Sequence, residues 1–404
     1  MSVSGPPKHH TTIPFNIPAV TGLELPHIIT ALQSTTLTTN GPYTRRCESW
    51  LETHLSCPRA LLTPSGTAAL HLAALILDLR PADEVILPTY THPATANAFL
   101  LRGATPVFID IVPETMTLDT NRLREALTPR TRAVVAMHYA GMSCDMDAIA
   151  EAVRDYSHRH SHSHDRGVHI VEDAAEGLFA MYKGREAGTM GALGCLSFDG
   201  GGNVTAGGQG GAVLVNDAAL RERAEMLRDQ GVVYGGGGGG GERSTDELVY
   251  AWQAVGGNFV LGELQAAFLW GQLEGAEAMQ IQRHRVWNLY WKELEALEGQ
   301  GVLQLPRLPA RCEHNASLFF VKVRDAAERR ELMEALKEIG ITVLPHYSPL
   351  HEGAPGRRFR YVASGEGLAS RESERLLCLP IYYALTVEDA RVVADSIRDF
   401  YSGR

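Results

Sequence analysis

"SFDGGGNVTAGGQGG", residues 197–211, is the stretch on which the interpretation of this chain depends. It begins at the end of the short run "GCLS" (194–197), so it has the form of a glycine-rich loop after a strand. Such a loop lets the backbone approach a ligand closely, because glycine has no side chain to keep the ligand away. The stretch contains neither lysine nor cysteine, so it offers no amine or thiol for a covalent bond to that ligand.

The segments around this loop alternate between short apolar runs and helix-like stretches from about residue 60 to residue 215. The apolar runs end in polar or glycine punctuation, as in "EVILPTYTH" (84–92), "TPVFIDI" (105–111), "RAVVAMHYAG" (132–141), "HIVEDAAEG" (169–177) and "GCLSFD" (194–199). Buried strands that alternate with helices are typical of βαβ units. We therefore predict an α/β fold with a mainly parallel sheet.

Ligands of parallel sheets bind at the carboxyl ends of the strands, so the residues that follow each run are the candidate site. They are Ser65 to Thr67, Thr91 to Thr95, His138, Asp173 to Glu176, and Asp199 with the loop after it. Ser65, Gly66 and Thr67 end a strand and open a helix, so their backbone N–H groups could bind a phosphate. An ordinary helix cap would have the same sequence, and this short motif alone does not distinguish the two.

Composition and charge narrow the class of partner. The 404 residues suffice for two domains, or for one large α/β domain with a smaller companion. The net charge of −10 argues against nucleic acid or an anionic membrane as the main partner. No apolar run reaches the roughly 18 residues that span a bilayer, and the N-terminus lacks the apolar core of a secretory signal. The six cysteines are scattered without metal spacing, so we expect reduced thiols, a cytoplasmic protein and no metal site.

The chain is expected to comprise an N-terminal arm (1–24), a large domain (25–275) and a small C-terminal α+β domain (276–404). A long amphipathic helix (261–297) would join the two domains, and the small domain would contain a strand at 315–323, a helix at 327–340 and a strand at 341–347. Two low-complexity tracts interrupt the pattern. The His/Ser-rich tract 157–167 could chelate a metal but is expected to be a solvated loop, and the seven glycines 235–241 form a flexible connector.

Taken in order, these segments resemble one family. They are "LTPSGTAAL" (62–70), "VILPTYTHPATANAF" (85–99), "VVAMHYAG" (134–141), "VEDAAEG" (171–177), "TAGGQGGAV" (205–213), "LGELQAAFL" (261–269), "PHYSPLH" (345–351) and "SERLLCLPIY" (373–382). The set is similar to the DegT/DnrJ/EryC1/StrS aminotransferases over about residues 12–402. Within that family it most resembles the transaminases that make dTDP-4-amino-4,6-dideoxygalactose. The resemblance implies a fold-type I enzyme dependent on pyridoxal phosphate (PLP), with a mainly parallel, seven-stranded type of sheet.

The resemblance also implies roles for individual residues. Asp173 would pair with the protonated ring nitrogen of the cofactor and keep the ring an electron sink. Ser197 would contact the phosphate, together with the segment Ser65–Thr67, and Asn203 matches an asparagine of the same cofactor loop. Asn258 matches a loop that reaches the neighbouring subunit's cofactor, which implies a homodimer with shared sites. A plain turn residue is the alternative for Asn258, and a surface loop residue is the alternative for Asp173.

The chain departs from the family pattern at the reactive position. The family loop reads roughly Ser-Phe-His-x-x-Lys-Asn, and its lysine forms the Schiff base with the cofactor. An ungapped match places Gly202 at the lysine and Asp199 at the histidine. Transamination uses that amine both to hold the cofactor and to move a proton, and glycine can do neither. The chain has five lysines, at 8, 183, 292, 322 and 337, and none is expected at a strand end of the large domain.

Other positions around the expected cofactor have changed as well. Glu176 stands where the family has glutamine, and a carboxylate there would repel a phenolate unless it were protonated. Gln209 replaces a glutamate, and His92 replaces an aromatic residue that stacks on the ring. In the dehydratase branch of the family a histidine replaces the lysine, and this chain lacks that histidine as well.

Four titratable residues remain as candidate acids or bases, namely Asp199, Glu176, His92 and His138. Each has a simpler alternative: a helix cap for Asp199, a solvated residue for Glu176, and packing or strand-end roles for the two histidines. We hypothesise a divergent enzyme that condenses or rearranges an amine and a carbonyl compound, with PLP or pyridoxamine phosphate (PMP) bound non-covalently or absent. The alternatives are a PLP- or PMP-dependent sugar aminotransferase or dehydratase, and a non-catalytic partner of an active paralogue.

Overall fold

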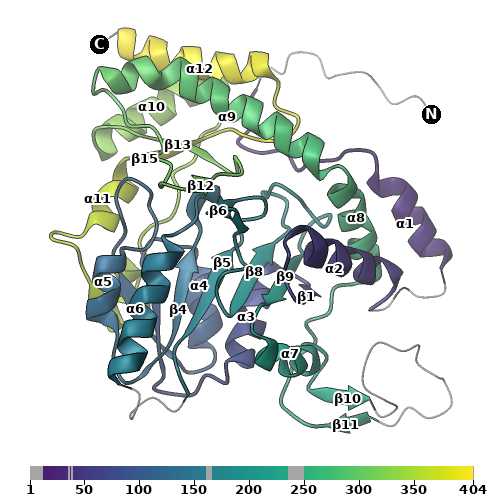
Figure 1. Cartoon of the computed structure of the whole chain (residues 1–404). Coiled ribbons are helices and arrows are strands. Elements are labelled where there is room, and N and C mark those ends of the chain that lie inside the picture. Colours follow the sequence, from purple (N-terminus) through teal and green to yellow (C-terminus); the bar gives the residue numbers. More distant parts are fainter. Residues whose placement is uncertain (1–11, 35–36, 38–39, 161–165, 235–249, 404) are drawn as a thin grey trace.

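The computed structural model describes residues 12–34, 37, 40–160, 166–234 and 250–403, and its centre is an eight-stranded sheet (Figure 1). The strand order is β1 (Ala60–Thr63), β9 (Gly211–Val215), β8 (Leu193–Ser197), β5 (His169–Ala174), β4 (Thr131–Met137), β2 (Glu84–Pro88), β3 (Thr105–Ile109) and β14 (Arg360–Val362). Strand β9 pairs antiparallel with β1 and β8, and the strands from β8 to β14 are all parallel. The predicted mainly parallel α/β fold is confirmed.

The sequence pattern did not predict two strands of this sheet, β9 and β14. Strand β14 lies in the C-terminal part of the chain and pairs with the edge strand β3, with Tyr361 opposite Phe108. Its three residues are too few to give a recognisable apolar run. The C-terminal part of the chain therefore completes the central sheet.

Helices cover both faces of the sheet, which explains why the inner strands β2 and β9 are buried along their whole length. On one face, β-strand residues such as Val85, Leu87 and Val135 share a core with α3 (Gly66–Ile76), α4 (Pro93–Leu100) and α7 (Arg221–Arg228). On the other face, the alternate residues Ile86 and Val134 pack with α5 (Thr120–Ala126) and α6 (Met146–Arg159).

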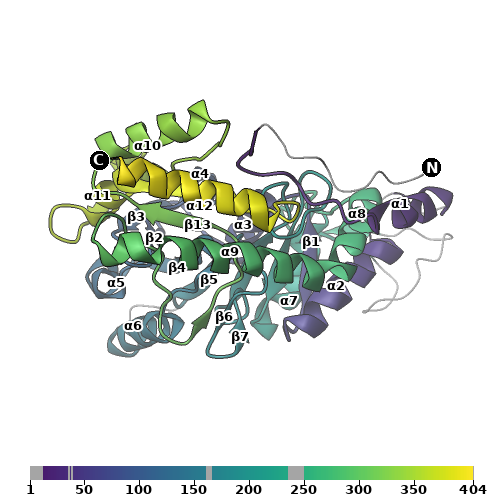
Figure 2. The ribbon, with the colours of Figure 1, turned by 90° about the horizontal axis from the view of Figure 1, so that it is seen from above.

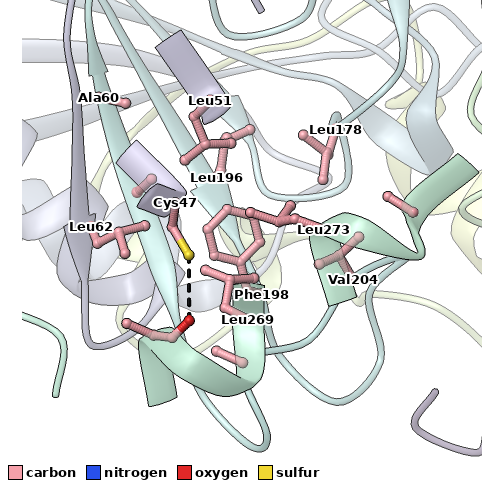
Figure 3. Close-up of a cluster of buried hydrophobic side chains, with 14 of the residues drawn as sticks. Cys47, Leu51, Ala60, Leu62, Leu178, Leu196, Phe198, Val204, Leu269 and Leu273 are labelled. Carbon is pink, nitrogen blue, oxygen red and sulfur yellow. Dashed lines mark hydrogen bonds between the residues drawn. The ribbon is translucent and has the colours of Figure 1, made fainter. Parts of the chain in front are cut away.

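The glycine-rich loop is fixed to a third core at the β1 edge of the sheet (Figure 3). Phe198, Val204 and Ala206 are buried there among residues of α2 (Pro42–His54) and α8 (Glu263–Glu274). The loop also closes on itself, because the Ala206 N–H donates to the Phe198 carbonyl at 2.9 Å. Helix α1 (Glu24–Gln33) packs against α8. The loop is thus held at both ends by apolar side chains rather than by its glycines.

The C-terminal part has its own core. It comprises α9 (Ala276–Gly299), β13 (Phe319–Lys322), α10 (Ala326–Glu338), α11 (Leu368–Arg375), β15 (Leu376–Leu379) and α12 (Val387–Ser402). Strands β13 and β15 pair antiparallel, and α12 lies alongside α9 (Figures 1 and 2). The division at residue 275 remains a prediction.

Two expected elements of this part were wrong. The helix predicted over 261–297 is two helices, α8 and α9, because the chain changes direction at Gly275. The strand predicted over 341–347 is extended backbone with single bridges, Ile13 to Ile341 and Leu344 to Cys378. Short strands complete the fold: β6 (Met181–Tyr182), β7 (Arg185–Glu186), β10 (Val232–Tyr234), β11 (Tyr250–Trp252) and β12 (Cys312–Glu313).

The two low-complexity tracts fall mostly outside the described residues. The glycine tract 235–241 is entirely outside, as is 161–165 of the histidine-rich tract. Helix α6 continues to Arg159, so the first residues of that second tract are helical and not part of a loop. In the described ranges no group of three or more potential metal ligands occurs, and no helix is long and apolar enough to cross a membrane. The six cysteines are unpaired, and five of them are buried.

Candidate functional site

Asp173 lies at the end of β5, at the carboxyl edge of the sheet, and its side chain is buried. The Thr95 hydroxyl donates to its Oδ2 at 2.6 Å, and the Ala175 N–H donates to Oδ1 at 3.3 Å. Burial raises the pKa of Asp173, although these two hydrogen bonds and the nearby His138 and His92 oppose the rise. A buried carboxylate at this place favours a positively charged or N–H-bearing ligand group beside it.

The predicted phosphate-binding segment lies next to the glycine-rich loop. Ser65 caps the N-terminus of α3, and its Oγ accepts a hydrogen bond from the Ala68 N–H at 3.0 Å. A Cβ atom at Gly66 would lie 2.8 Å from the Cβ of Ser197, so only glycine allows β8 to approach the helix so closely. Thr67 is exposed at the first turn. The helix N-terminus and the Ser197 hydroxyl together can bind an anionic group.

Asp199 forms the turn of the glycine-rich loop. Its Oδ1 accepts hydrogen bonds from the N–H groups of Gly201 at 2.8 Å and Gly202 at 3.0 Å, and its Oδ2 accepts one from Ser197 Oγ at 3.3 Å. These bonds match the capping role that was the alternative for this residue. The carboxylate is occupied by its own loop, so we no longer favour Asp199 as an acid or base.

Gly202, which stands at the family's lysine position, lies in that turn. A Cβ there would lie 3.3 Å from the Val204 carbonyl oxygen, a tight contact that a side chain could make only if the loop shifted by a few tenths of an ångström. The described lysines lie elsewhere. Lys183 pairs with Asp147 and Lys322 with Glu372, whereas Lys292 on α9 and Lys337 on α10 are exposed. Lys8 lies outside the described residues.

Glu176 is held close to Asp173. The Ala140 N–H donates to its Oε2 at 2.7 Å, and the Tyr347 hydroxyl donates to Oε1 at 3.4 Å. Burial and the negative charges of Asp173 and Asp199 together raise the pKa of Glu176 to about 7, against the two hydrogen bonds, which lower it. Glu176 is therefore partly protonated at neutral pH, unlike the solvated carboxylate that was its alternative.

Tyr347 is the residue of this site that the sequence argument missed. Its ring lies among the rings of Tyr90, at 5.6 Å, and Tyr139, at 6.1 Å, and it stacks on His346 at 4.0 Å. Burial raises the pKa of the Tyr347 hydroxyl well above its usual value. The segment "PHYSPLH" that contains it was used only for the family resemblance. No signal in the sequence joined it to Glu176, 171 residues away.

The two candidate histidines have different places. His92 is exposed, and its Nδ1 accepts a hydrogen bond from the Ala94 N–H at the start of α4, while its ring lies 6.0 Å from that of Tyr347. His138 is buried, with Nε2 2.8 Å from Glu172 and Nδ1 accepting from the Cys144 N–H at 3.1 Å. Both nitrogens of His138 are thus occupied by the protein, as a packing role requires, and we no longer favour it as an acid or base.

The two asparagines do not meet at this site in a single chain. Asn203 is buried, and its Nδ2 donates to the Asn315 carbonyl at 2.8 Å and to Gln280 at 3.2 Å, which ties the loop to α9. Its Oδ1 is buried without a hydrogen-bond partner. Asn258 is exposed in the segment between β11 and α8, where it forms a bridge with Asp229. Its predicted role at a neighbouring subunit's cofactor remains a prediction.

Comparison with known proteins identifies the family. The profile of the DegT/DnrJ/EryC1/StrS aminotransferase family matches residues 19–398. The chain belongs to this family. GDP-perosamine synthase of Caulobacter vibrioides is 30% identical to this DegT/DnrJ/EryC1/StrS chain, over 93% of the chain and 95% of the relative. The chain is therefore an aminotransferase-family protein with relatives among sugar aminotransferases.

Solved structures agree with this assignment. DesV of S. venezuelae is 31% identical and superimposes with a TM-score of 0.80, covering 94% of each chain. A sugar aminotransferase-like protein, Spr1654 of Streptococcus pneumoniae, superimposes with a TM-score of 0.86 over 96% of this chain and 98% of its own, at 22% identity. Spr1654 has been solved in PMP and PLP forms. At this low identity the second likeness shows the fold, which is that of the PLP-dependent sugar aminotransferases.

Proposed function

We propose that this chain is a divergent enzyme of the aminotransferase family that works without a catalytic lysine. It would join or rearrange an amine and a carbonyl compound, both small molecules, by acid–base chemistry. The observation that supports this most is the contrast within one site: Gly202 offers no amine, while Glu176 lies half-buried near Asp173 with a pKa of about 7. A pKa near the working pH suits a group that both accepts and releases protons.

The residues present fit a PLP or PMP molecule that is bound without a covalent bond. Ser65–Thr67 and Ser197 would hold its phosphate, and Asp173 would face its ring nitrogen. Glu176, when protonated, can donate to the phenolic oxygen, which removes the repulsion expected from a carboxylate at that position. When bound, the cofactor would supply an electron-withdrawing ring that stabilises negative charge on an attached carbon.

The chain's own residues would carry the proton transfers of a condensation. As the substrate amine forms its C–N bond to the substrate carbonyl carbon, ionised Glu176 would accept one proton from the nitrogen and return it to the carbonyl-derived oxygen, which gives a carbinolamine. A second transfer of the same kind, from the nitrogen to the carbinolamine hydroxyl, would break the C–O bond, release water and leave a C=N bond. Tyr347 and the rings of Tyr90 and Tyr139 exclude bulk water from this carboxyl group.

A sugar aminotransferase or dehydratase that uses free PLP or PMP is the second candidate, and the relatives named GDP-perosamine synthase favour it. The test is equilibrium binding of PLP to the purified protein, combined with its absorption spectrum. We expect binding without the visible band of a covalent lysine adduct. Efficient amination of a nucleotide-linked keto-sugar would support the second candidate, and failure to bind PLP would leave cofactor-free chemistry or the non-catalytic partner role.

We also propose that the protein is a cytoplasmic homodimer. Large apolar side chains are exposed on two surfaces, at Leu25 and Leu32 of α1 and at Trp252 and Val255 beside β11. Trp252 is 71% exposed, and exposed large apolar side chains are candidates for burial in a protein–protein contact. Light scattering coupled to size exclusion tests this, and a mass of a single chain at micromolar concentration contradicts it.

A further inference from the structure

The carboxyl group of Glu176 accepts hydrogen bonds from two segments that are far apart in the sequence. On one side the Ala140 N–H, in the turn after β4, donates to Oε2 at 2.7 Å. On the other side the Tyr347 hydroxyl, in the segment 345–349 before β14, donates to Oε1 at 3.4 Å. Each oxygen of the carboxyl group therefore has a donor from a different part of the chain.

The segments that contain Ala140 and Tyr347 are also hydrogen-bonded to each other. The Tyr139 hydroxyl lies 3.0 Å from His346 Nδ1, and the Tyr90 hydroxyl donates to the His346 carbonyl at 3.1 Å. Tyr139 directly precedes Ala140, and His346 directly precedes Tyr347. The contacts thus form a closed ring, in which Glu176 is joined to both segments and the segments are joined behind it.

The backbone of both segments is held in an unfavourable conformation at the residues that touch Glu176. Ala140 has φ +55° and Tyr347 has φ +23°, values that residues other than glycine seldom adopt. Such conformations persist only where surrounding contacts enforce them, and they concentrate at functional sites. Here the enforcing contacts are the hydrogen bonds of the ring.

We propose that Tyr347 is a positioning residue for Glu176, whose hydroxyl donates to the ionised carboxyl group and thereby sets the protonation equilibrium of that acid. In the lysine-free site, the pair Glu176 and Tyr347 then provides the proton-transferring group. Only the use made of this proton rests on the proposed function. The pairing itself rests on the ring of contacts.

Other charged and titratable groups face this pair and act in known directions. Asp173 from β5 and Asp199 from the loop after β8 both disfavour the ionised form of Glu176. The ring of His92, at the start of α4, lies near the ring of Tyr347. The ring of the adjacent residue His346 stacks on the ring of Tyr347. Tyr347 is the side chain whose hydrogen bond favours the ionised carboxylate, so removing its hydroxyl should favour the protonated form.

The test is the pH titration of Glu176 in the ligand-free protein, monitored by NMR of ¹³C-labelled side-chain carboxyl carbons. The signal is assigned by its disappearance in Glu176→Gln. We expect wild-type Glu176 to titrate near pH 7 and Tyr347→Phe, which keeps the ring and its burial, to raise that pKa by about half a pH unit or more. Tyr139→Phe breaks the closed ring of hydrogen bonds at a place that does not contact Glu176, so it should raise the pKa of Glu176 by less.

Tyr361→Phe is the matched control, because it removes a hydroxyl from the same part of the chain at β14, and we expect it to leave the Glu176 titration unchanged. The proposal is overturned if Tyr347→Phe leaves or lowers the pKa of Glu176, or if Tyr361→Phe shifts it equally. It is also overturned if wild-type Glu176 titrates at its ordinary value. Thermal unfolding of each variant confirms that the fold is retained.

The same variants separate this inference from the proposed function. PLP binding measured as a function of pH reports whether the protonated form of Glu176 is the one that accepts the cofactor. If PLP does not bind, the cofactor proposal fails, while the Glu176 titration in the ligand-free variants still decides the role of Tyr347.

Discussion

The site has two parts, a holding end for the proposed phosphate and a reacting end, and they differ in how far their residues match the family pattern. At the holding end, Ser65–Thr67 and Ser197 keep the expected residue types, and the helix N-terminus of α3 meets β8 there. At the reacting end, Gly202, Glu176 and His92 all differ from the pattern. The proposed anion site depends on backbone N–H groups and glycine, so it does not require the side chains that differ at the reacting end.

Asp173→Asn should have the largest effect, because it removes the buried charge that would face the ring nitrogen of a bound cofactor. The loss of a buried charge-assisted hydrogen bond costs about 3 kcal/mol, which corresponds to roughly 100-fold weaker binding of PLP. Equilibrium binding measures this. Asp325→Asn, at the exposed cap of α10, is the control. Equal PLP affinity for Asp173→Asn and wild type would remove Asp173 from the site.

Glu176→Gln should change stability in a pH-dependent way. The folded-state pKa, about 7, lies above the ordinary value of 4.5, so folding disfavours the ionised form. The stability that the protonated carboxyl provides is complete below about pH 4.5 and is lost as the pH rises through 7. The variant should therefore gain up to about 3 kcal/mol relative to wild type at pH 8 and little at pH 4. Denaturant unfolding at the two pH values checks this, and a pH-independent difference contradicts it.

Thr95→Val tests the support of Asp173 at the reacting side of the sheet. It removes the hydroxyl that donates to Asp173 at 2.6 Å but keeps the side-chain shape. The pKa of Asp173 should rise further, and PLP binding should weaken about tenfold, because one charge-assisted hydrogen bond is lost. Thr67→Val, at an exposed position of the holding end, provides a comparison. An unchanged affinity in Thr95→Val would mean that this hydrogen bond does not organise the site.

Asp199→Ala should mainly loosen the glycine-rich loop. Its carboxylate accepts from two backbone N–H groups and from Ser197, so its loss should cost about 1 kcal/mol of unfolding free energy. If Asp199 only forms the turn, the pH dependence of any activity should keep its shape. A lost limb in the pH profile would instead restore Asp199 as an acid or base.

Gly202→Lys is the sharpest test of the contrast and should have the smallest effect. A Cβ at this position would lie 3.3 Å from the Val204 carbonyl oxygen, so the loop must shift slightly and the variant should fold with a somewhat lower Tm than wild type. Because Glu176 and His92 would remain, we expect less than about a tenfold gain in amination of a nucleotide-linked keto-sugar. Robust amination would show that a single residue separates this chain from its relatives.

The sequence predicted most of the sheet, because strands depend on local patterns. Apolar runs with polar ends predicted β1, β2, β3, β4, β5 and β8, and the strand ends indicated where Asp173 and Ser65–Thr67 lie. The most informative chemical fact, the glycine at 202, also needs no structure, since the absence of an amine is visible in the sequence. The pattern did not predict β9 or the very short β14, and the single helix predicted across Gly275 was wrong because the helix is interrupted there.

Only the tertiary structure decided which candidate side chains are available for chemistry. Asp199, Glu176 and His138 were equivalent candidates in the sequence, since ionisable residues at strand ends look alike. Their surroundings distinguish them: Asp199 accepts hydrogen bonds from its own turn, both nitrogens of His138 have protein partners, and Glu176 is half-buried near another carboxylate. Tyr347 reaches Glu176 from 171 residues away. Local pattern fixes where a strand ends, but burial, charge and proton affinity depend on neighbours that only folding brings together.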